Sequence, residues 1–379
     1  MAPELLTLKT VPSLEQISEA QWDALLSPHD TPFVKHRFLL GLELTGCLKG
    51  DSGWKSLHIT LWDGDTLIAA APCYLKSNSE GEFVYDFSWA QVAYQMGIPY
   101  YPKLLVGVPF TPATGGRLLV HPLAPEGTRQ KLIEGIKQVY EATGVSSLHI
   151  NFVWEEDARA LEQAGFVLWY GVQYQWKNPG FSSWEDFLSR FNAKRRKQLK
   201  REKREVESYA QTHTHRGAEI SPQVLDVMHR VYVGTADKYF PYTRQYLTRG
   251  FFEWMRTQLP EHLEIVMAED HGRPLAAALC IRGAERLYGR YWGSLEERPF
   301  LHFHVCYYHS IEECIRYGIK VFEPGAGGEH KRPRGFEPTM TFSAHLIRDA
   351  RLNRLIRTQL MRHNTWVVQQ LEKGELPED

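Results

Sequence analysis

The stretch FEPGAGGEHKRPRGFEP, from Phe322 to Pro338, gathers chemically active side chains directly after a glycine-rich bend. Glu323, Glu329 and His330 are residue types that can take a proton from an attacking amine, so all three are candidate catalytic residues. The spacing differs from that of phosphate-binding nucleotide loops, because the lysine follows a Glu-His pair instead of a glycine. Both a catalytic turn and an ordinary solvated loop fit this composition.

The backbone and the basic residues of the same stretch can bind anions. Glycines expose backbone N–H groups, and such groups stabilise anions and developing oxyanions. Lys331, Arg332 and Arg334 add charge that could hold a phosphate or a carboxylate. The substrate-binding residues predicted here are Gly325, Gly327, Gly328, Lys331 and Arg334.

A second candidate feature is the strand-like segment LYGRYWGS. Its period of two predicts that Tyr288, Arg290 and Trp292 share one face. An arginine between aromatic rings is suited to clamping a substrate, and we predict substrate contacts from Arg290 and Trp292. A core strand with one paired arginine is the alternative interpretation.

Metal-capable residues recur along the helical segment that begins at Phe300. His302, Cys306, His309 and Glu313 follow one another at spacings that place them on one helix face. We predict no metal, because one helix seldom supplies four ligands and no HExxH motif is present. This face is instead expected to meet a core and a pocket, to which Tyr308 also contributes.

An aromatic and proline-rich segment in the first half lacks helical or strand periodicity. Irregular backbone with many rings can form a pocket wall, since rings offer apolar area together with a polar group. A packed loop over the core, with a solvated Lys103, is the alternative. The predicted substrate-binding residues in this segment are Trp89, Tyr100, Tyr101, Lys103, Phe110 and Thr111.

Basic residues crowd the segment between Arg190 and Arg204, where Glu202 is the single acid. A helix of this kind could bind the backbone of an RNA, in a salt-dependent manner. A solvated helix face is the other interpretation, and charges all round the helix are consistent with it.

The whole chain has 379 residues and a formal net charge of -1. A near-neutral charge gives no general attraction to nucleic acid or anionic membrane, so such binding needs a local patch. We expect no signal peptide and no membrane insertion, because no apolar run approaches the roughly 20 residues of a spanning helix. Five cysteines without a CxxC pair indicate a reduced, soluble, cytoplasmic protein.

The elements around these residues show a coarse duplication. Residues 54–75 and 262–283 both alternate as two strands around a glycine turn, so each predicts a β-hairpin. Residues 125–144 carry apolar side chains at helical spacing and end at a glycine. The Asn-Pro-Gly sequence at 178–180 suggests a boundary between two domains, 1–178 and 179–379.

The chain resembles the FemAB-like branch of the GNAT acyltransferase superfamily. The strings that carry this resemblance are YYPKLLVGVPFTPATGGRLL, LYGRYWGS, FLHFHVCYYHSIEECI and FEPGAGGEHKRPRGFEPTMTFSAH. The resemblance implies an α/β fold of two tandem GNAT-like domains, with mixed sheets flanked by helices and a cleft between the domains.

The same resemblance implies an N-acyltransferase that moves an acyl or aminoacyl group to an amine of a small molecule or peptide, with a cell-wall precursor as one candidate. It implies acyl-CoA or aminoacyl-tRNA as donor substrate, with Lys194–Arg204 as the segment where a tRNA could bind, and it implies no tightly bound cofactor and no metal. The places equivalent to the acyl-CoA loop read HPLAPEGTRQ and SLEERPFLHF, and neither has the usual glycine-punctuated basic motif. The alternative is a non-catalytic protein that recognises a peptidoglycan peptide or another ligand.

Overall fold

The computed structural model describes residues 6–240 and 244–373, and the side chain of Glu329 lies outside the described part. The chain forms two compact units. Unit 1 consists of Met1–Val172 together with Met340–Pro377, and unit 2 contains Gln173–Thr339. The chain passes from one unit to the other within two strands, β9 (Val167–Lys177) and β15 (Glu337–Ile347).

These units differ from the predicted division at residues 178 and 179, because the first boundary lies at Val172 and Gln173 and the chain later returns to unit 1. The segment Met340–Pro377, which was assigned to the second domain, belongs to unit 1. Most of β15 lies in that segment and pairs with a strand of unit 1, and α12 (Ala350–Lys373) buries its apolar residues against Trp89. A single cut in the sequence cannot represent a chain that returns to its first unit.

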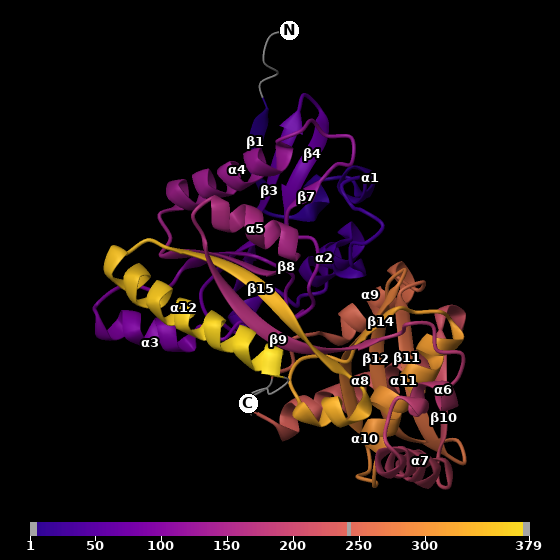
Figure 1. Cartoon of the computed structure of the whole chain (residues 1–379). Coiled ribbons are helices and arrows are strands. Elements are labelled where there is room, and N and C mark those ends of the chain that lie inside the picture. Colours follow the sequence, from indigo (N-terminus) through magenta and orange to yellow (C-terminus); the bar gives the residue numbers. More distant parts are fainter. Residues whose placement is uncertain (1–5, 241–243, 374–379) are drawn as a thin grey trace. The chain divides into compact units, whose positions relative to one another are not determined.

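Unit 1 contains two groups of strands with helices packed on them (Figure 1). The four-stranded sheet has the order β1 (Thr7–Val11), β3 (His58–Asp63), β4 (Thr66–Ala71) and β7 (Leu119–Val120). The second group has the order β15, β8 (Ser147–Val153), β6 (Lys103–Val106), β5 (Cys73–Lys76) and β2 (Trp54–Ser56). The helices of unit 1 are α1 (Glu19–Asp23), α2 (His36–Leu44), α3 (Phe87–Gln95), α4 (Thr128–Thr143), α5 (Glu155–Gln163) and α12.

Unit 2 is built on strands in the order β10 (Gln211–Arg216), β11 (Leu263–Asp270), β12 (Arg273–Arg282), β13 (Arg286–Ser294), β14 (Val321–Glu323) and β9. Its helices include α6 (Trp184–Ser189), α7 (Ala193–Glu207), α8 (Pro222–Lys238) and α9 (Arg249–Gln258). After β13 come α10 (Leu301–Phe303), a π-helical segment η5 (His304–Tyr308) and α11 (His309–Arg316) without interruption. The 3-10 helix η6 (Glu329–Arg334) follows β14.

The prediction of mixed sheets with flanking helices is confirmed. Each unit combines antiparallel hairpins with one parallel pair, β6 with β8 in unit 1 and β13 with β14 in unit 2. Both predicted hairpins are present, as β3–β4 and β11–β12. Residues 125–144 contain α4, which buries Leu132 and Ile136 and ends at the left-handed Gly144.

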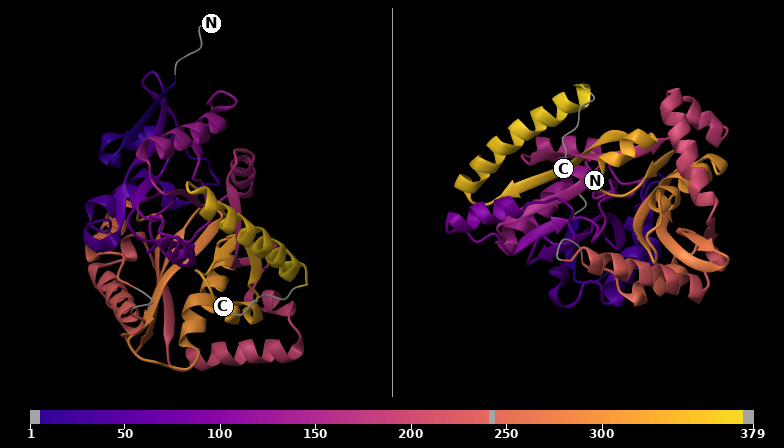
Figure 2. Two further views of the ribbon diagram at one scale, coloured as in Figure 1. Left: turned by 90° about the vertical axis from the view of Figure 1, so that its left-hand side faces the viewer. Right: turned by 90° about the horizontal axis from the view of Figure 1, so that it is seen from below.

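The strands of unit 2 are covered on both faces, as Figure 2 shows. On one face lies α8, and a side chain at Gly293 would collide with the backbone oxygen of Val231 in that helix at 2.2 Å. On the other face lies the helix that begins at α10, where the ring of His302 packs on Trp292. Gly293 therefore allows β13 and α8 to approach closely.

Candidate functional site

Unit 2 contains a cavity of about 290 Å³ at the place where β13 and β14 separate. The parallel pairing of the two strands runs from Arg286 to Tyr288 on β13, and Pro324, which follows β14, has no N–H with which to extend it. The cavity is lined by Ala278, Leu279, Cys280, Gly289, Arg290, Tyr291, Trp292, His302, Cys306, Tyr307, Pro324, Gly325, Ala326, Gly327, Gly328, His330 and Lys331. The strand end, the glycine bend and the helix that were singled out in the sequence thus meet at one cavity.

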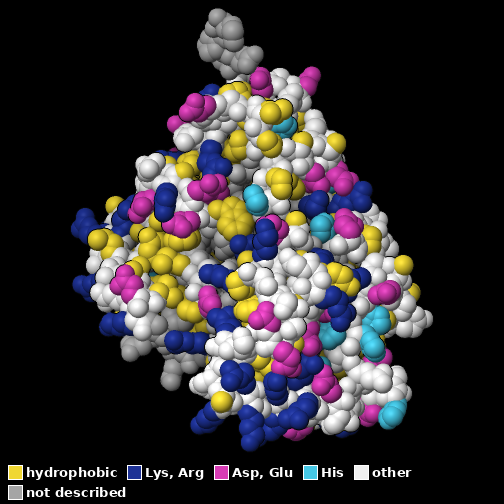
Figure 3. Space-filling model, turned by 45° about the vertical axis from the view of Figure 1, so that its right-hand side comes forward, with side chains coloured by type: hydrophobic (Ala, Val, Ile, Leu, Met, Phe, Trp, Pro, Cys, Tyr) yellow, Lys and Arg dark blue, Asp and Glu magenta, His cyan; other side chains and the backbone are white. Residues whose placement is uncertain are grey.

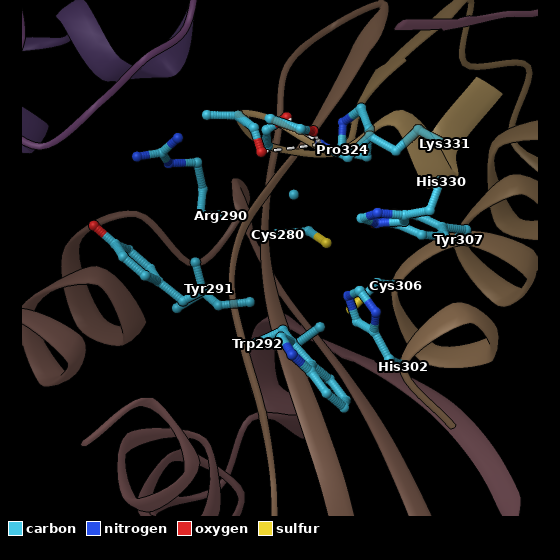
Figure 4. A pocket seen from close by; sticks show the side chains of 17 residues that line it. Cys280, Arg290, Tyr291, Trp292, His302, Cys306, Tyr307, Pro324, His330 and Lys331 are labelled. Carbon is cyan, nitrogen blue, oxygen red and sulfur yellow. Dashed lines mark hydrogen bonds between the residues drawn. The ribbon is translucent and has the colours of Figure 1, made fainter. Parts of the chain in front are cut away.

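A β-bulge at Arg290 shapes one wall of this cavity. Cys280 pairs with Gly289, whereas the neighbouring Leu279 pairs with Tyr291, so Arg290 is the extra residue. Arg290 and Tyr291 point to one side of β13, while Trp292 points to the opposite side (Figure 4). The prediction that Arg290 and Trp292 share one face is therefore wrong, because the bulge shifts the alternation by one residue.

The glycine bend is organised by the buried side chain of Lys331. Its ammonium nitrogen donates to the carbonyl oxygens of Gly325 at 2.7 Å and Ala326 at 3.0 Å, and also to that of Gly327. An ammonium group has three N–H donors, which match the three carbonyls. Lys331 is thus directed at the backbone of the bend, and the anion contact predicted for it is not what its ammonium makes here.

This arrangement directs backbone donors of the cavity-lining bend away from Lys331. In a planar trans peptide the N–H points away from the C=O of the same unit. Because the carbonyls of residues 325–327 converge on Lys331, the N–H groups of Ala326, Gly327 and Gly328 point away from it. None of the three donates to an acceptor among the described residues. Such a row of N–H groups is suited to binding an anion or an oxyanion.

An imidazole lies beside these donors. The Nε2 atom of His330 lies 2.9 Å from the hydroxyl oxygen of Tyr307. Partial burial and the charges of Lys331 and Arg334 lower the pKa of His330, so the ring is neutral at pH 7. A side chain on Gly328 would collide with the His330 ring at 2.5 Å, so the glycine makes room for the imidazole.

A second imidazole, that of His302, lines the cavity on the same side. Its ring centroid lies 4.6 Å from that of Trp292 and 5.9 Å from that of His330. Burial lowers the pKa of His302 to about 4, and the charges of Lys331 and Arg334 act in the same direction. Sequence reasoning expected the helix face that carries His302 to meet a core and a pocket, but it did not name His302 among the candidate site residues.

Of the two carboxylates predicted to be catalytic, the side chain of Glu323 is described and that of Glu329 is not. Glu323 ends β14 as a buried residue and accepts a hydrogen bond from Arg286 at 2.8 Å. Burial raises the pKa of Glu323 to about 6, against the opposing effect of Arg286. Glu323 is not among the cavity-lining residues. The side chain of Glu329 lies outside the described part, so its catalytic role stays a prediction.

Tyr308 and Arg334 form a network of their own, away from the cavity lining. Arg334 donates to Tyr308 at 2.9 Å and to the carboxylate of Glu202 at 3.1 Å, and Tyr308 donates to the same carboxylate. Tyr307, the preceding residue of η5, contacts His330 instead, because adjacent residues of a helix point in different directions. Arg334 is thus paired with a residue of α7, and a substrate contact from Tyr308 or Arg334 stays a prediction.

The four metal-capable residues of this helix face do not meet at one place. His302 and Cys306 line the cavity, whereas His309 hydrogen-bonds Thr214 at 2.9 Å and Glu313 pairs with Arg216 at 2.6 Å. Among the described residues there is no group of three or more side chains placed to hold a metal ion.

The predicted binding residues of the first half lie in unit 1, which we describe by itself. All of them are buried except Tyr101, which is partly exposed. Lys103 forms ion pairs with Glu82 at 2.8 Å and with Asp86 at 2.5 Å, so the alternative of a solvated lysine is wrong. Tyr100 donates to Asp86 at 2.6 Å.

The remaining first-half residues contact their own unit as well. Trp89 packs on Trp169 with 5.3 Å between centroids, Phe110 packs on Trp54 at 5.5 Å, and the hydroxyl of Thr111 donates to the carbonyl of Pro109 at 2.9 Å. These contacts fit the alternative of a packed segment. A substrate wall shared with unit 2 stays a prediction.

Unit 1 has a parallel pair comparable to β13 and β14, but its own chain fills the space beyond it. The pairing of β6 with β8 runs from Leu104 to Val106. The buried guanidinium of Arg117 then donates to the carbonyl oxygens of Asn151 at 2.9 Å and Ala113 at 2.7 Å. We therefore place the candidate site in unit 2.

The basic helix α7 has one exposed face of positive charge. Lys194, Lys197, Arg201 and Arg204 are exposed, and their spacing places them along one stripe of the helix. Dark-blue side chains gather over this helix at the lower end of the face in Figure 3. Other basic residues of α7 are paired, such as Lys200 with Glu185 at 2.6 Å. The charges therefore do not surround the helix evenly.

None of the helices within residues 6–240 and 244–373 combines the length and the apolar character that crossing a bilayer requires.

Comparison with known proteins gives the following findings. A family model described as FemAB-like, peptidoglycan biosynthesis/recognition, matches residues 13–376. No curated protein matches the chain. Among solved structures, FemX is 12% identical with a TM-score of 0.54, and the match covers 90% of this chain and 98% of FemX.

Two further solved structures are similar. The C-terminal domain of a putative lysylphosphatidylglycerol synthetase from Agrobacterium fabrum is 9% identical with a TM-score of 0.54, covering 92% of this chain and 96% of that one. L-PGS from Bacillus licheniformis is 11% identical with a TM-score of 0.50, covering 87% and 94%. At these identities the likeness shows the fold, which is the predicted tandem GNAT-like fold.

Proposed function

Because the chain belongs to the FemAB-like family, we propose that it transfers an acyl or aminoacyl group from an activated donor to the nitrogen of an amine. The observation that carries the proposal is the cavity beyond the paired part of β13 and β14, whose lining combines the glycine bend with the neutral imidazole of His330. Acyl transfer needs these two devices, one to stabilise an oxyanion and one to take a proton.

In the proposed reaction the donor's carbonyl carbon lies in this cavity. The amine nitrogen attacks it, and the negative charge that develops on the carbonyl oxygen is stabilised by the N–H groups of Ala326, Gly327 and Gly328. Lys331 is a positioning residue, because it holds the carbonyls of the bend on the opposite side. No covalent enzyme intermediate is required once both partners are oriented.

His330 is the proposed base. When Nε2–H donates to the oxygen of Tyr307, Nδ1 carries a free lone pair that can accept the proton of the attacking nitrogen. A C–N bond forms, the C–O or C–S bond to the donor breaks, and the leaving oxygen or sulfur receives the proton. Glu329 is the alternative base from the sequence.

The chemistry of the donor is proposed from the charged surfaces of unit 2. The exposed stripe Lys194, Lys197, Arg201 and Arg204 supports the phosphate backbone of an aminoacyl-tRNA as the bound part of the donor. The segment before α10 offers no comparable cationic loop, because Arg298 there pairs with Glu296 at 2.9 Å. An acyl thioester is the alternative donor, and a cell-wall precursor is one candidate acceptor.

The proposal is tested by looking for the amide product directly. Purified protein is incubated with a small-molecule cell extract and either tRNA charged with isotope-labelled amino acids or labelled acyl-CoA, and mass spectrometry searches for labelled amides. A labelled product that falls at least about 100-fold in His330→Gln supports the proposal, since general bases contribute roughly that much or more. His29→Gln, an exposed histidine of unit 1, is the matched control and should retain full turnover.

Two other outcomes count against parts of the proposal. Full turnover in His330→Gln removes this residue as the base and leaves Glu329 to be tested by Glu329→Gln. If neither donor yields an amide, while a peptidoglycan peptide binds to the wild-type protein, the chain is a recognition protein and the transferase proposal fails.

A further inference from the structure

Four rings form one side of the unit 2 cavity, which we call the ring-lined lobe: Trp292, His302, Tyr307 and His330 (Figure 4). The Trp292 and His302 centroids are 4.6 Å apart, the His302 and Tyr307 centroids 5.4 Å, and the Tyr307 and His330 centroids 5.9 Å. Cys306 of the same helix completes the wall. Flat rings at these separations offer van der Waals contact to another flat group.

No charged group among the described residues is directed into this lobe. Lys331 donates to three carbonyls, and Arg334 is paired with Glu202, so neither cation faces a ligand there. Arg290 points to the opposite side of β13 (Figure 4). The described lining includes no carboxylate. A carboxylate held among these four rings would therefore lack an ion-pair partner among the described side chains, and a buried charge without a partner is unfavourable.

Aromatic rings can also hold an ammonium group by a cation–π contact, and this alternative must be weighed. The surroundings oppose it. Burial, His330, Lys331 and Arg334 together lower the pKa of His302 to about 4, which means that they disfavour a positive charge at that ring. A cation held next to the same ring experiences the same unfavourable burial and repulsion.

We propose that the ring-lined lobe selects the group being transferred, accepting an uncharged planar group, such as an aromatic ring or a carboxamide, and rejecting a side-chain ammonium or guanidinium. This inference rests on the proposed function, because it assumes that the group bound in the lobe is the acyl or aminoacyl part of the donor. Trp292 is its specificity-determining residue, because its ring packs on His302 and lines the cavity.

Three probes of nearly equal shape separate charge from size. Benzamide is neutral, benzamidine is a cation and benzoate is an anion at pH 7. Ligand-observed NMR titration of each probe with the full-length protein measures its affinity without requiring turnover. Benzamide is expected to bind about tenfold more tightly than either charged probe, which corresponds to about 1.4 kcal/mol.

Two variants assign the binding to the lobe. Trp292→Leu is expected to weaken benzamide binding about tenfold, since it removes the ring contact. Trp366→Leu, which removes a partly exposed tryptophan of α12 in unit 1, should leave the affinity unchanged. If Trp292→Leu fails to fold, as judged by circular dichroism, His302→Leu takes its place with the same expected loss.

The outcomes distinguish this inference from the proposed function. Benzamidine or benzoate binding as tightly as benzamide, or no benzamide binding that depends on Trp292 or His302, overturns the inference. Transfer of lysyl groups as efficiently as phenylalanyl groups overturns it too, while the proposed function stands. Benzamide binding with the expected variant effects but no amide formation supports the lobe's selectivity and removes the proposed function.

Discussion

The ammonium nitrogen of Lys331 lies 2.7 Å from the carbonyl oxygen of Gly325, six residues earlier in the chain. Ala326 and Gly327 also direct their carbonyl oxygens at the same nitrogen. One buried cation thus binds three successive backbone carbonyls, and the opposite edges of their peptide groups point away from it. The lysine that the sequence suggested as an anion ligand instead holds the backbone that is proposed to stabilise the oxyanion.

Replacing this lysine should therefore disorder the bend without removing any atom that touches the substrate. Lys331→Met leaves three carbonyls without their donor, and we expect the free energy of unfolding to fall by about 1–3 kcal/mol. The rate of amide formation should fall by about 100-fold or more, the effect of losing an oxyanion donor. Urea unfolding and the mass-spectrometric assay measure the two effects.

The neighbouring Arg332 supplies the matched control, since it is exposed and carries the same charge. Arg332→Met should leave both the stability and the rate close to those of the wild-type protein. A Lys331→Met protein with normal turnover would show that the bend keeps its shape without the lysine, and the proposed role of these N–H groups would then be wrong.

Gly328 offers a second test, because a side chain at this position would displace the proposed base His330. It has a φ of 93°, and a Cβ atom there would lie 2.5 Å from Cε1 of His330. Gly328→Ala should displace the imidazole and reduce turnover by about 100-fold. Gly272→Ala, in the β11–β12 turn, also has a positive φ but meets no atom within 4 Å, so it should cost about 1 kcal/mol of stability and no activity. Equal turnover in the two variants would contradict a role for the His330 position.

Much of the fold follows from local patterns in the sequence. The hairpins β3–β4 and β11–β12 were predicted from alternation around a glycine turn, and α4 from apolar residues at helical spacing with Gly144 at its end. These signals involve neighbours in the chain, so composition and spacing are sufficient to find them. The return of α12 to unit 1 depends on contacts with residues about 190 or more positions away, which no local pattern reports.

The site was predicted less completely, and for two physical reasons. The bulge at Arg290 is a property of strand pairing, and one extra residue moves Trp292 to the other face. The bonds of Lys331 and Arg117 are to backbone carbonyls, whose positions depend on the folded chain and not on residue type. The Glu-His-Lys sequence after a glycine run was nevertheless enough to identify His330 and the bend as candidate site residues.

Lys103 tests whether the first-half residues have a structural role. Its ammonium is fully buried and pairs with both Glu82 and Asp86. Lys103→Met would leave buried Asp86 without its cation and Glu82 with only its longer pair to Lys76 at 3.9 Å, and we expect unit 1 to lose about 3–5 kcal/mol. Lys131→Met, at an exposed position of α4, should change stability by less than about 0.5 kcal/mol. Thermal unfolding followed by circular dichroism measures both.

A substrate contact from Lys103 would give a different result. In that case Lys103→Met would unfold like the wild-type protein but would bind its substrate more weakly, seen as a raised KM with little change in kcat. A large loss of stability together with an unchanged KM in the remaining folded protein supports the structural role.

The pH dependence of turnover tests His330 as the base. The charged and titratable groups that act on it are Tyr307, His302, Lys331 and Arg334, and its pKa is lowered by partial burial and by the last two. A base works in its unprotonated form, so kcat/KM should be constant above the lowered pKa and should fall about tenfold per pH unit below it. The acid limb should therefore lie below the ordinary histidine value of about 6.5. Profiles from about pH 5 to about pH 8 measure it, and His330→Gln should lose this limb along with most of the rate. An acid limb that persists unchanged in His330→Gln would assign the proton transfer to another group.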